Sequence, residues 1–295
     1  MMKKIVSIVM LGSVAVGLAA LSSCEPMDGL VVLEDYRTCV SYVYDHKTNT
    51  GFVDNGSTYK VTLDRTAQNF GVECDNVRFY DGAPALSAKV IGMNQYFSAD
   101  SSYVFMLQRG LSRSSGDFRI DSLRYGVVGN FWLTYFAEER YEVNVVPLKY
   151  NLETDTVSIH KSKVGVNSWA RIYFDTNLSI RYMATIDPDA RTLSLKVYGQ
   201  KFQTGGRPYE YVLPDIPLTF SNEGYTVSAE KVAATDFKGN PLPQFDAYDL
   251  TGSFATSFEG VKELTYFFAP YAGDDGVEYV ERMRIKFYNH SMVEK

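Results

Sequence analysis

The chain has 295 residues, a formal net charge of −6, 45% hydrophobic residues and 14% aromatic residues. This length accommodates one large domain or two of ordinary size, and the hydrophobic fraction excludes a disordered chain. With 29 basic against 35 acidic residues, and no basic cluster that stands out, the composition argues against nucleic acid as a partner. It also argues against electrostatic binding to anionic membrane surfaces.

The N-terminal segment has the pattern of an export signal. Lys3 and Lys4 precede an apolar run over residues 5–20, which is shorter than the roughly 20 residues that a membrane-spanning helix needs. The run ends in Leu21-Ser-Ser-Cys24. We therefore predict that residues 1–23 form a signal peptide.

The segment Leu21–Cys24 resembles the lipobox of bacterial lipoproteins, in which an aliphatic residue and two small residues precede the lipidated cysteine. The resemblance implies cleavage before Cys24, diacylglycerol on its sulfur and a further acyl chain, such as palmitate, on its new amine. Several acyl chains give a stable membrane anchor. We expect residues 24–36 to form a lipidated tether and the protein to be anchored in the outer membrane, with the periplasmic or surface face left open.

Beyond the tether, the sequence predicts an all-β protein. Tyr, Phe, Val and Thr are abundant, and no long segment keeps the 3.6-residue period of a helix. Apolar residues alternate with polar ones, as in Phe70, Val72 and Cys74 and again in Leu193, Leu195 and Val197. This period of two is typical of antiparallel strands with one face in water.

The strand-rich body contains an internal repeat. Five pairs of segments recur in the same order, namely Tyr42–Asp45 with Ile172–Asp175, Tyr59–Ala67 with Tyr182–Ala190, Ser98-Ala99 with Ser228-Ala229, Phe118 and Leu123 with Phe245 and Leu250, and Leu133–Phe136 with Leu264–Phe267. We predict two tandem copies of one antiparallel domain, at 37–147 and 169–288, joined by a linker over 148–168 and followed by a tail over 289–295. Seven or eight short strands per copy fit a β-sandwich or a small β-barrel, and the pattern leaves that choice open.

Two cysteines, Cys39 and Cys74, lie in the body of the protein. An exported protein meets an oxidising compartment, where a disulfide between them is chemically allowed. Buried free thiols are the equally weighted alternative, because the repeat places apolar residues at the equivalent positions. A catalytic thiol is not expected, since neither cysteine has a nearby histidine.

No metal-binding or catalytic pattern is present in the sequence. His46, His160 and His290 do not have the short spacings of zinc ligands, and surface positions are expected for them. The acidic pairs at Asp187 and Asp189 and at Asp274 and Asp275 have turn compositions rather than a calcium-loop pattern. The sequence therefore predicts no cofactor, no metal and no catalytic residue.

Aromatic residues are the remaining candidates for a ligand site. Most of them fall in the repeated segments, where a role in the core is expected. Tyr209 and Tyr211 belong to one copy only and are the weak ligand candidates.

The lipobox at Cys24 followed by tandem Tyr- and Phe-rich β-domains resembles the outer-membrane lipoproteins of gut Bacteroidota. The resemblance implies a non-enzymatic binding or scaffolding role in the cell envelope, with a glycan, a peptide or an envelope protein as partner. Two alternatives remain: a calycin-like pair of barrels that each enclose a small apolar ligand, and a glycan hydrolase whose carboxylates are hidden in the fold.

Overall fold

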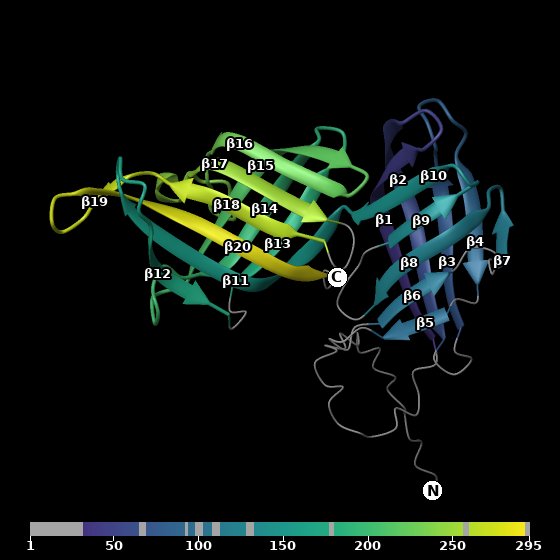
Figure 1. Cartoon of the computed structure of the whole chain (residues 1–295), viewed down its shortest axis with the longest axis horizontal. Helices are drawn as coiled ribbons and strands as arrows, with labels where there is room; N and C mark the ends of the chain where they lie inside the picture. The colour runs from purple at the N-terminus through teal and green to yellow at the C-terminus, as the bar shows by residue number, and fades with distance from the viewer. Residues whose placement is uncertain are drawn as a thin grey trace, which may run out of the picture.

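The computed structural model describes residues 32–64, 69–91, 94–97, 103–107, 113–127, 133–176, 180–255 and 260–292. Within these ranges the chain is all-β, as predicted, with a short 3-10 helix, η2 (Pro243–Phe245). The strands form two antiparallel sheets, one from each half of the chain (Figure 1). The predicted signal peptide and Cys24 lie outside the described residues.

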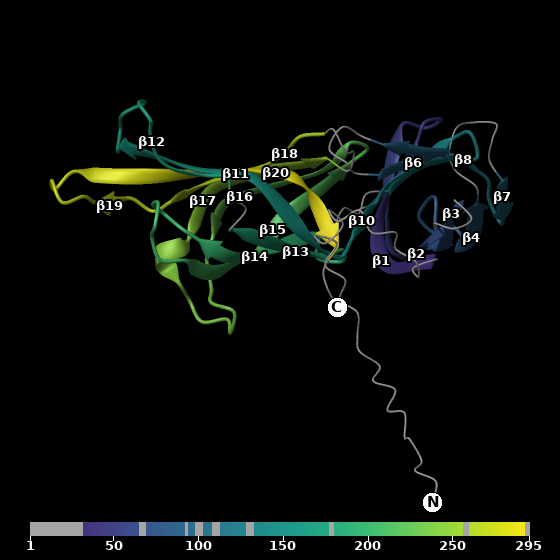
Figure 2. The same ribbon diagram turned by 90° about the horizontal axis from the view of Figure 1, so that it is seen from below.

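The first sheet contains ten strands, which are β1 (Val32–Asp45), β2 (Thr50–Asp64), β3 (Asn69–Val77), β4 (Leu86–Ile91), β5 (Asn94–Phe97), β6 (Tyr103–Leu107), β7 (Arg113–Gly116), β8 (Ile120–Val127), β9 (Leu133–Ala137) and β10 (Tyr141–Pro147). β1 pairs with both β2 and β10. At the ends of the strand order, β4 pairs with β7 and β5 pairs with β6. β4 and β5 are consecutive strands, as are β6 and β7, and the sheet curls into a nearly closed eight-stranded barrel (Figure 2). We call it the first barrel.

The second sheet contains β11 (Lys149–Lys163), β12 (Ala170–Asp175), β13 (Arg181–Asp187), β14 (Thr192–Gln200), β15 (Tyr209–Ser221), β16 (Gly224–Val232), β17 (Ala247–Ala255), β18 (Lys262–Phe268), β19 (Tyr271–Ala272) and β20 (Glu278–Met292). β11 pairs with β13 on one side and with β20 on the other. These pairings close an eight-stranded barrel, the second barrel, and β12 and β19 extend beyond it. The choice between sandwich and barrel, which the sequence left open, is therefore decided for the barrel.

Residues 148–168 differ from the predicted linker. Lys149–Lys163 is the long first strand of the second barrel, so only Leu148 separates the last strand of one barrel from the first strand of the next. The Leu148 amide donates to the Thr38 carbonyl over 3.4 Å, and the Leu148 carbonyl accepts from the Ile186 amide over 2.8 Å. β-bulges near Glu153 and Thr154 interrupt the alternation of side chains, which is why this strand has no clear period of two in the sequence. The outer ends of the two domains also differ from the predicted residues 37 and 288, since β1 begins at residue 32 and β20 runs to residue 292.

The two barrels also pack against each other. Val40 and Val146 are paired on β1 and β10, and both are buried in the hydrophobic cluster of the second barrel. The Asn144 side-chain amide donates to the Asn222 carbonyl over 2.6 Å. This junction explains why β10 is buried on both of its faces.

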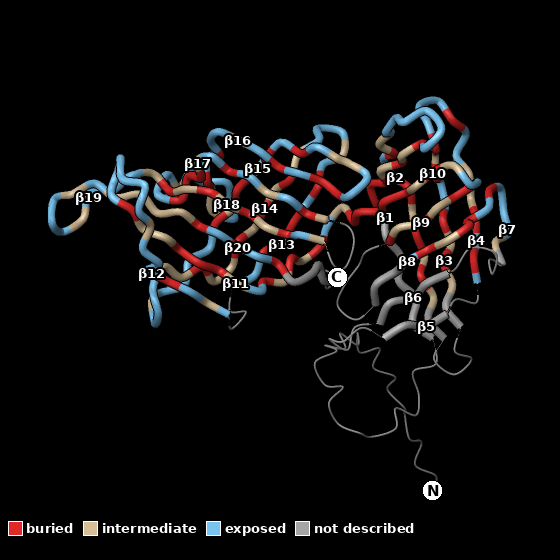
Figure 3. Tube along the Cα trace, in the orientation of Figure 1, coloured by how far each residue is buried: buried red, intermediate tan, exposed pale blue. Residues whose placement is uncertain are grey.

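Buried residues alternate with intermediate or exposed ones along many strands of both barrels (Figure 3). The predicted alternation is confirmed at Val72 and Cys74 and at Leu193, Leu195 and Val197, all of which are buried. An eight-stranded barrel has an interior just wide enough to be filled by side chains. The turn composition at Asp187 and Asp189 corresponds to a hairpin turn between β13 and β14, in which the Asp187 carboxylate accepts from the backbone amides of Asp189 and Ala190.

Most described segments of the predicted repeat lie at matching places in the two barrels. Tyr59 lies on β2, the second strand of the first barrel. Tyr182 lies on β13, which belongs to the second strand of the second barrel when β12 and β13 are counted as one interrupted strand. Leu133–Phe136 and Leu264–Phe267 lie on the seventh strands. The segments Tyr42–Asp45 and Ile172–Asp175 do not correspond, because the first belongs to β1 and the second to β12. Ser98-Ala99 lies outside the described residues.

Candidate functional site

The two cysteines of the body, Cys39 and Cys74, are buried free thiols and do not form the disulfide that the sequence allowed. Cys39 lies on β1 and Cys74 on β3, with β2 between them. Two strand spacings amount to about 9.5 Å, whereas a disulfide needs Cα atoms within about 7 Å. Burial raises the pKa of the Cys74 thiol, which keeps this group in its unreactive form.

Tyr209 and Tyr211 do not form a shared ligand site. Tyr211 is fully buried in the second barrel, where its hydroxyl lies 2.7 Å from that of Tyr266. Tyr209 is partly exposed and packs against Phe202 and Phe245. Tyr211 is therefore a core residue, and Tyr209 alone could contact a ligand.

The predicted surface histidines and acidic turns are accounted for by local contacts. His46 pairs with Glu142 at 2.9 Å, and Asp275 accepts the hydroxyl of Tyr279 at 2.7 Å. Across the described residues, no group of three His, Cys, Asp or Glu side chains is arranged to hold a metal ion. The side chain of His290 is outside what the structure describes.

Large side chains and polar networks fill the interiors of the barrels. In the first barrel, the Ser41 hydroxyl lies 2.6 Å from that of Ser57 and 2.7 Å from that of Tyr59, which in turn lies 3.2 Å from the hydroxyl of Tyr135. In the second barrel, the Tyr182 hydroxyl donates to Gln200 over 3.1 Å. These residues occupy the space that an enclosed apolar ligand would need.

The outer face of the second barrel carries the candidate site. Strand register places Arg171 of β12, His160 of β11, Arg282 of β20 and Phe267 of β18 side by side in one row. The next two rows contain Ser158, Arg284 and Thr265, and then Thr156, Lys286 and Glu263. We call this surface, defined by Arg171, His160, Arg282, Arg284 and Lys286 with the residues between them, the cationic face.

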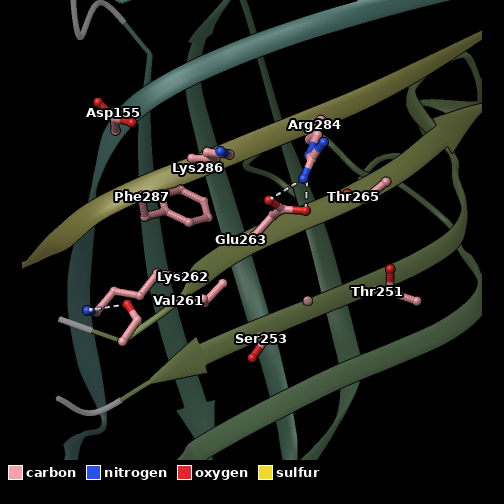
Figure 4. A pocket seen from close by; sticks show the side chains of 12 residues that line it. Asp155, Thr251, Ser253, Val261, Lys262, Glu263, Thr265, Arg284, Lys286 and Phe287 are labelled. Atoms are coloured by element: carbon pink, nitrogen blue, oxygen red, sulfur yellow. Dashed lines mark hydrogen bonds and ion pairs between the residues drawn. The ribbon is translucent and has the colours of Figure 1, made fainter. Parts of the chain in front are cut away.

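Beside β20 the cationic face is hollowed into an open concavity of about 720 Å³ (Figure 4). Its lining includes the hydroxyl side chains of Thr251, Ser253 and Thr265, together with Arg284 and Lys286. The residues come from β11, β17, β18 and β20 and from the segment that precedes β18. The volume is in the range of small-molecule sites, and the lining combines hydroxyl and charged groups with apolar surface from residues such as Val261 and Phe287.

Two carboxylates, Asp155 and Glu263, line the concavity. Glu263 accepts from Nε of Arg284 at 3.1 Å and from Nη2 at 2.9 Å, so this carboxylate is held in a two-point ion pair. Lys262 is buried at the edge of the concavity, where its amine donates to the Gly260 carbonyl over 3.3 Å. Burial lowers the pKa of Lys262 to about 8.

The other cations of the face have no carboxylate partner among the described residues. Arg171 and Lys286 are exposed, and the guanidinium of Arg282 stacks on Trp169 with 4.7 Å between its carbon and the ring centroid. The Nε of Arg282 is buried without a hydrogen-bond partner in the described part of the chain. Glu281, the neighbour of Arg282 in sequence, bonds instead to Tyr271.

The histidine of the face, His160, lies among three of its arginines. The pKa of His160 is lowered, first by partial burial and then by the charges of Arg282, Arg171 and Arg284. Its Nε2 lies 3.2 Å from the hydroxyl of Ser158.

Sequence reasoning missed this face. Arg282, Arg284 and Lys286 alternate with Met283 and Ile285, so the run of charges does not look like a basic cluster. In a strand, alternate residues share one side, and the alternation itself is the signal that would have indicated a row of cations. Arg171 and His160 join that row only through strand pairing.

Comparisons with known proteins add little to this description. No protein-family model matches the chain, and no curated protein sequence matches it either. Two solved structures of Transferrin Binding Protein B (TbpB) from Haemophilus parasuis Hp5, a double mutant and a single mutant, are similar at 9% and 10% identity with TM-scores of 0.23 and 0.24. Each match covers 90% of this chain and 76% of the other. A likeness at this level says nothing about activity or partner.

Among the residues that the structure describes, no helix is long and apolar enough to cross a membrane.

Proposed function

We propose that this chain is a lipid-anchored, non-enzymatic binding protein of the cell envelope, and that it holds its ligand on the cationic face of the second barrel. The anchor is Cys24, on the strength of the Leu21–Cys24 lipobox pattern. Tethering through several acyl chains leaves both barrels outside the bilayer, where a strand face is accessible to a partner.

The observation that carries the proposal is the contrast between the interiors of the barrels and the cationic face. The interiors are filled, with Tyr59, Tyr135, Tyr182, Tyr211 and Tyr266 all nearly inaccessible to solvent. Outside, Arg171, Arg282 and Lys286 lie on the same face without a carboxylate partner in the described chain, in a protein of net charge −6. Like charges held together repel one another, and the arrangement is relieved when an anion binds.

The same contacts disfavour the two alternative functions. A calycin-like carrier needs an open apolar interior, and here that volume is occupied by tyrosine and phenylalanine side chains. A glycan hydrolase needs two carboxylates with oxygens available for acid and nucleophile or base roles. Of the two carboxylates in the concavity, Glu263 is already engaged by Arg284.

The anchor and the binding face can be tested separately. Cells that express the whole chain or its Cys24→Ala variant are labelled with a radioactive fatty acid, and incorporation should be lost in the variant. Protease treatment of intact cells then decides which side of the outer membrane the protein faces. Labelling that persists in Cys24→Ala would contradict the anchor.

For the binding face, the whole chain in detergent is compared with an Arg171→Gln/Lys286→Gln variant against glycan arrays and envelope extracts. Both side chains are exposed and unpaired by carboxylates in the described chain, so the variant should fold normally. A ligand that binds the wild type and not the variant supports the proposal. If every ligand found binds the wild type and the variant equally, the cationic face is not the binding site.

A further inference from the structure

We infer that the ligand of the cationic face is a linear acidic polysaccharide, one whose repeating unit carries a carboxylate or a sulfate, lying along β20. This inference rests on the proposed function and names the ligand class for that same site. Three observations support it: the spacing of the cations, the aromatic groups beside them and the polar lining of the concavity.

The cations of β20 form a regular linear array. Arg282, Arg284 and Lys286 alternate with the buried Met283 and Ile285, so all three lie on the outer side of the strand. Alternate residues of a strand are about 6.8 Å apart, which gives a row of three cationic side chains over about 14 Å. The middle one, Arg284, is paired with Glu263, and Arg282 and Lys286 on either side of it have no carboxylate partner in the described chain. A chain of anionic sugars has charges that recur along a line, and it can contact such a row at successive units.

Aromatic rings accompany this row at the end nearest β12. Trp169 packs against Phe267, with 5.9 Å between ring centroids, and both are partly exposed. Phe174 is 46% exposed and lies beneath the guanidinium of Arg171 at 4.9 Å. Aromatic rings present flat apolar faces on which the C–H faces of sugar rings can stack, while guanidinium groups bind carboxylate or sulfate in a two-point geometry.

The concavity at the other end of the row is suited to hydroxyl-rich ligands. Thr251, Ser253 and Thr265 present hydroxyl groups that both donate and accept hydrogen bonds. Arg284 is fixed by its ion pair with Glu263, so its orientation is set before the ligand arrives. Prepositioned polar groups reduce the entropy lost on binding.

A folded acidic protein fits the same surface less well. Stable protein interfaces have an apolar core that excludes water and a polar rim. Here charged and hydroxyl side chains run through the centre of the face, and the aromatic groups lie toward one end. The surface therefore favours a slender polyanion over a globular partner.

The test measures binding of the whole chain in detergent to four immobilised polymers: polygalacturonate, chondroitin sulfate, uncharged dextran and poly-glutamate. We expect binding to one or both acidic polysaccharides, weakened when salt is raised from 50 to 200 mM, and none to dextran. Polygalacturonate carries carboxylates alone, whereas chondroitin sulfate carries both carboxylates and sulfates, so binding to the second polymer only would indicate that the sulfate is required. Binding to poly-glutamate equal to that of the saccharides would mean that the face recognises charge alone, and it would overturn the inference.

The matched variants remove two charges each. Arg171→Gln/Lys286→Gln should weaken binding of the saccharide about five- to thirtyfold, while Arg207→Gln/Lys238→Gln, which removes two exposed cations elsewhere on the second barrel, should change it less than twofold. Arg282→Lys keeps the charge and removes the planar guanidinium. Weaker binding by this variant would show that the ligand is recognised through the geometry of the guanidinium and not through net charge alone. Equal loss in both double variants would overturn the inference.

Failure of this inference is distinguishable from failure of the proposed function. If no acidic polysaccharide binds, yet a ligand from the wider screen is lost in Arg171→Gln/Lys286→Gln, the ligand class is wrong and the cationic face stands. If every ligand found in that screen binds the variant as well as the wild type, the proposed function itself is wrong.

Discussion

The hydroxyl oxygens of Tyr59 and Tyr135 lie 3.2 Å apart inside the first barrel, on the second and seventh strands. The residues that the repeat aligns with them, Tyr182 and Tyr266, lie on the second and seventh strands of the second barrel, and both are fully buried there. The aromatic neighbours agree: Phe79 contacts Phe118 in one barrel, and Phe202 contacts Phe245 in the other. Contacts between aligned residues support the proposal that the barrels arose by duplication.

The tyrosine pair gives the first prediction. Tyr59→Phe removes a hydroxyl that contacts both Ser41 and Tyr135, so the buried hydroxyls of these two residues lose a hydrogen-bond partner. We expect the free energy of unfolding to fall by about 1–3 kcal/mol, measured by urea denaturation of the whole chain. The exposed Tyr80→Phe should change it by less than about 0.5 kcal/mol. Equal effects of the two substitutions would show that the buried network contributes nothing.

The cysteines give a second prediction, made in a Cys24→Ala chain that retains only Cys39 and Cys74. Because both thiols are buried, and burial raises the pKa of Cys74, native protein should resist iodoacetamide at pH 8. In urea without reductant, both residues should be alkylated, giving a mass increase of two adducts by mass spectrometry. A chain that is alkylated in urea only after reduction would contain the disulfide that the strand order excludes.

Lys262 gives a third prediction, because burial lowers its pKa to about 8 from a usual value of 10.5. Between these values the unfolded chain binds a proton that the folded chain does not, so stability rises as pH increases from 8 to 10.5. Below pH 8 the full cost of the buried charge is present. Lys262→Met should therefore be more stable than wild type at pH 7, by about 1–3 kcal/mol, and the difference should shrink toward pH 10.5. Thermal unfolding across this range measures it, and a difference independent of pH would contradict the assignment.

The junction between the barrels gives a fourth prediction. Val146 lies on β10 of the first barrel and is buried against the second. Val146→Asp places a carboxylate in this contact, which should lower the unfolding temperature and let the barrels unfold in separate steps. Differential scanning calorimetry resolves the steps. Val164→Asp, at a site 47% exposed, is the control and should leave the calorimetric trace unchanged.

The sequence alone could predict the strands and the doubling, but not the closure of the barrels. The alternation of apolar and polar residues at Leu193, Leu195 and Val197 is local in sequence, so it could be predicted from the sequence alone. Closure of the second barrel depends on pairs such as Ser158 with Arg284, which are far apart in sequence. No local period encodes such a pair.

The candidate site escaped prediction for the same reason. It is assembled from Arg171, His160 and Arg282, which lie on three strands and become neighbours only through register. Residues 149–163 were predicted as part of a linker and are a strand, β11, because bulges in it break the alternation that marks a strand. Turn chemistry was readable, as Asp187 shows, since the carboxylate and the amides it accepts from are within three residues.

His160 gives the last prediction, which links the pH of the solution to ligand binding. Partial burial first, and then the charges of Arg282 and Arg284 from β20 and Arg171 from β12, hold its pKa below the usual value. A bound polyanion screens these charges and favours the protonated ring, so binding should raise the pKa of His160 and take up a proton. Affinity for chondroitin sulfate, whose sulfates stay ionised, should therefore increase as pH falls from 7 to 5. Isothermal titration in buffers of different ionisation enthalpy measures the proton uptake, and NMR follows the ring directly. In His160→Gln both the uptake and the pH slope should be reduced, and a variant that keeps the full slope would place the titrating group elsewhere.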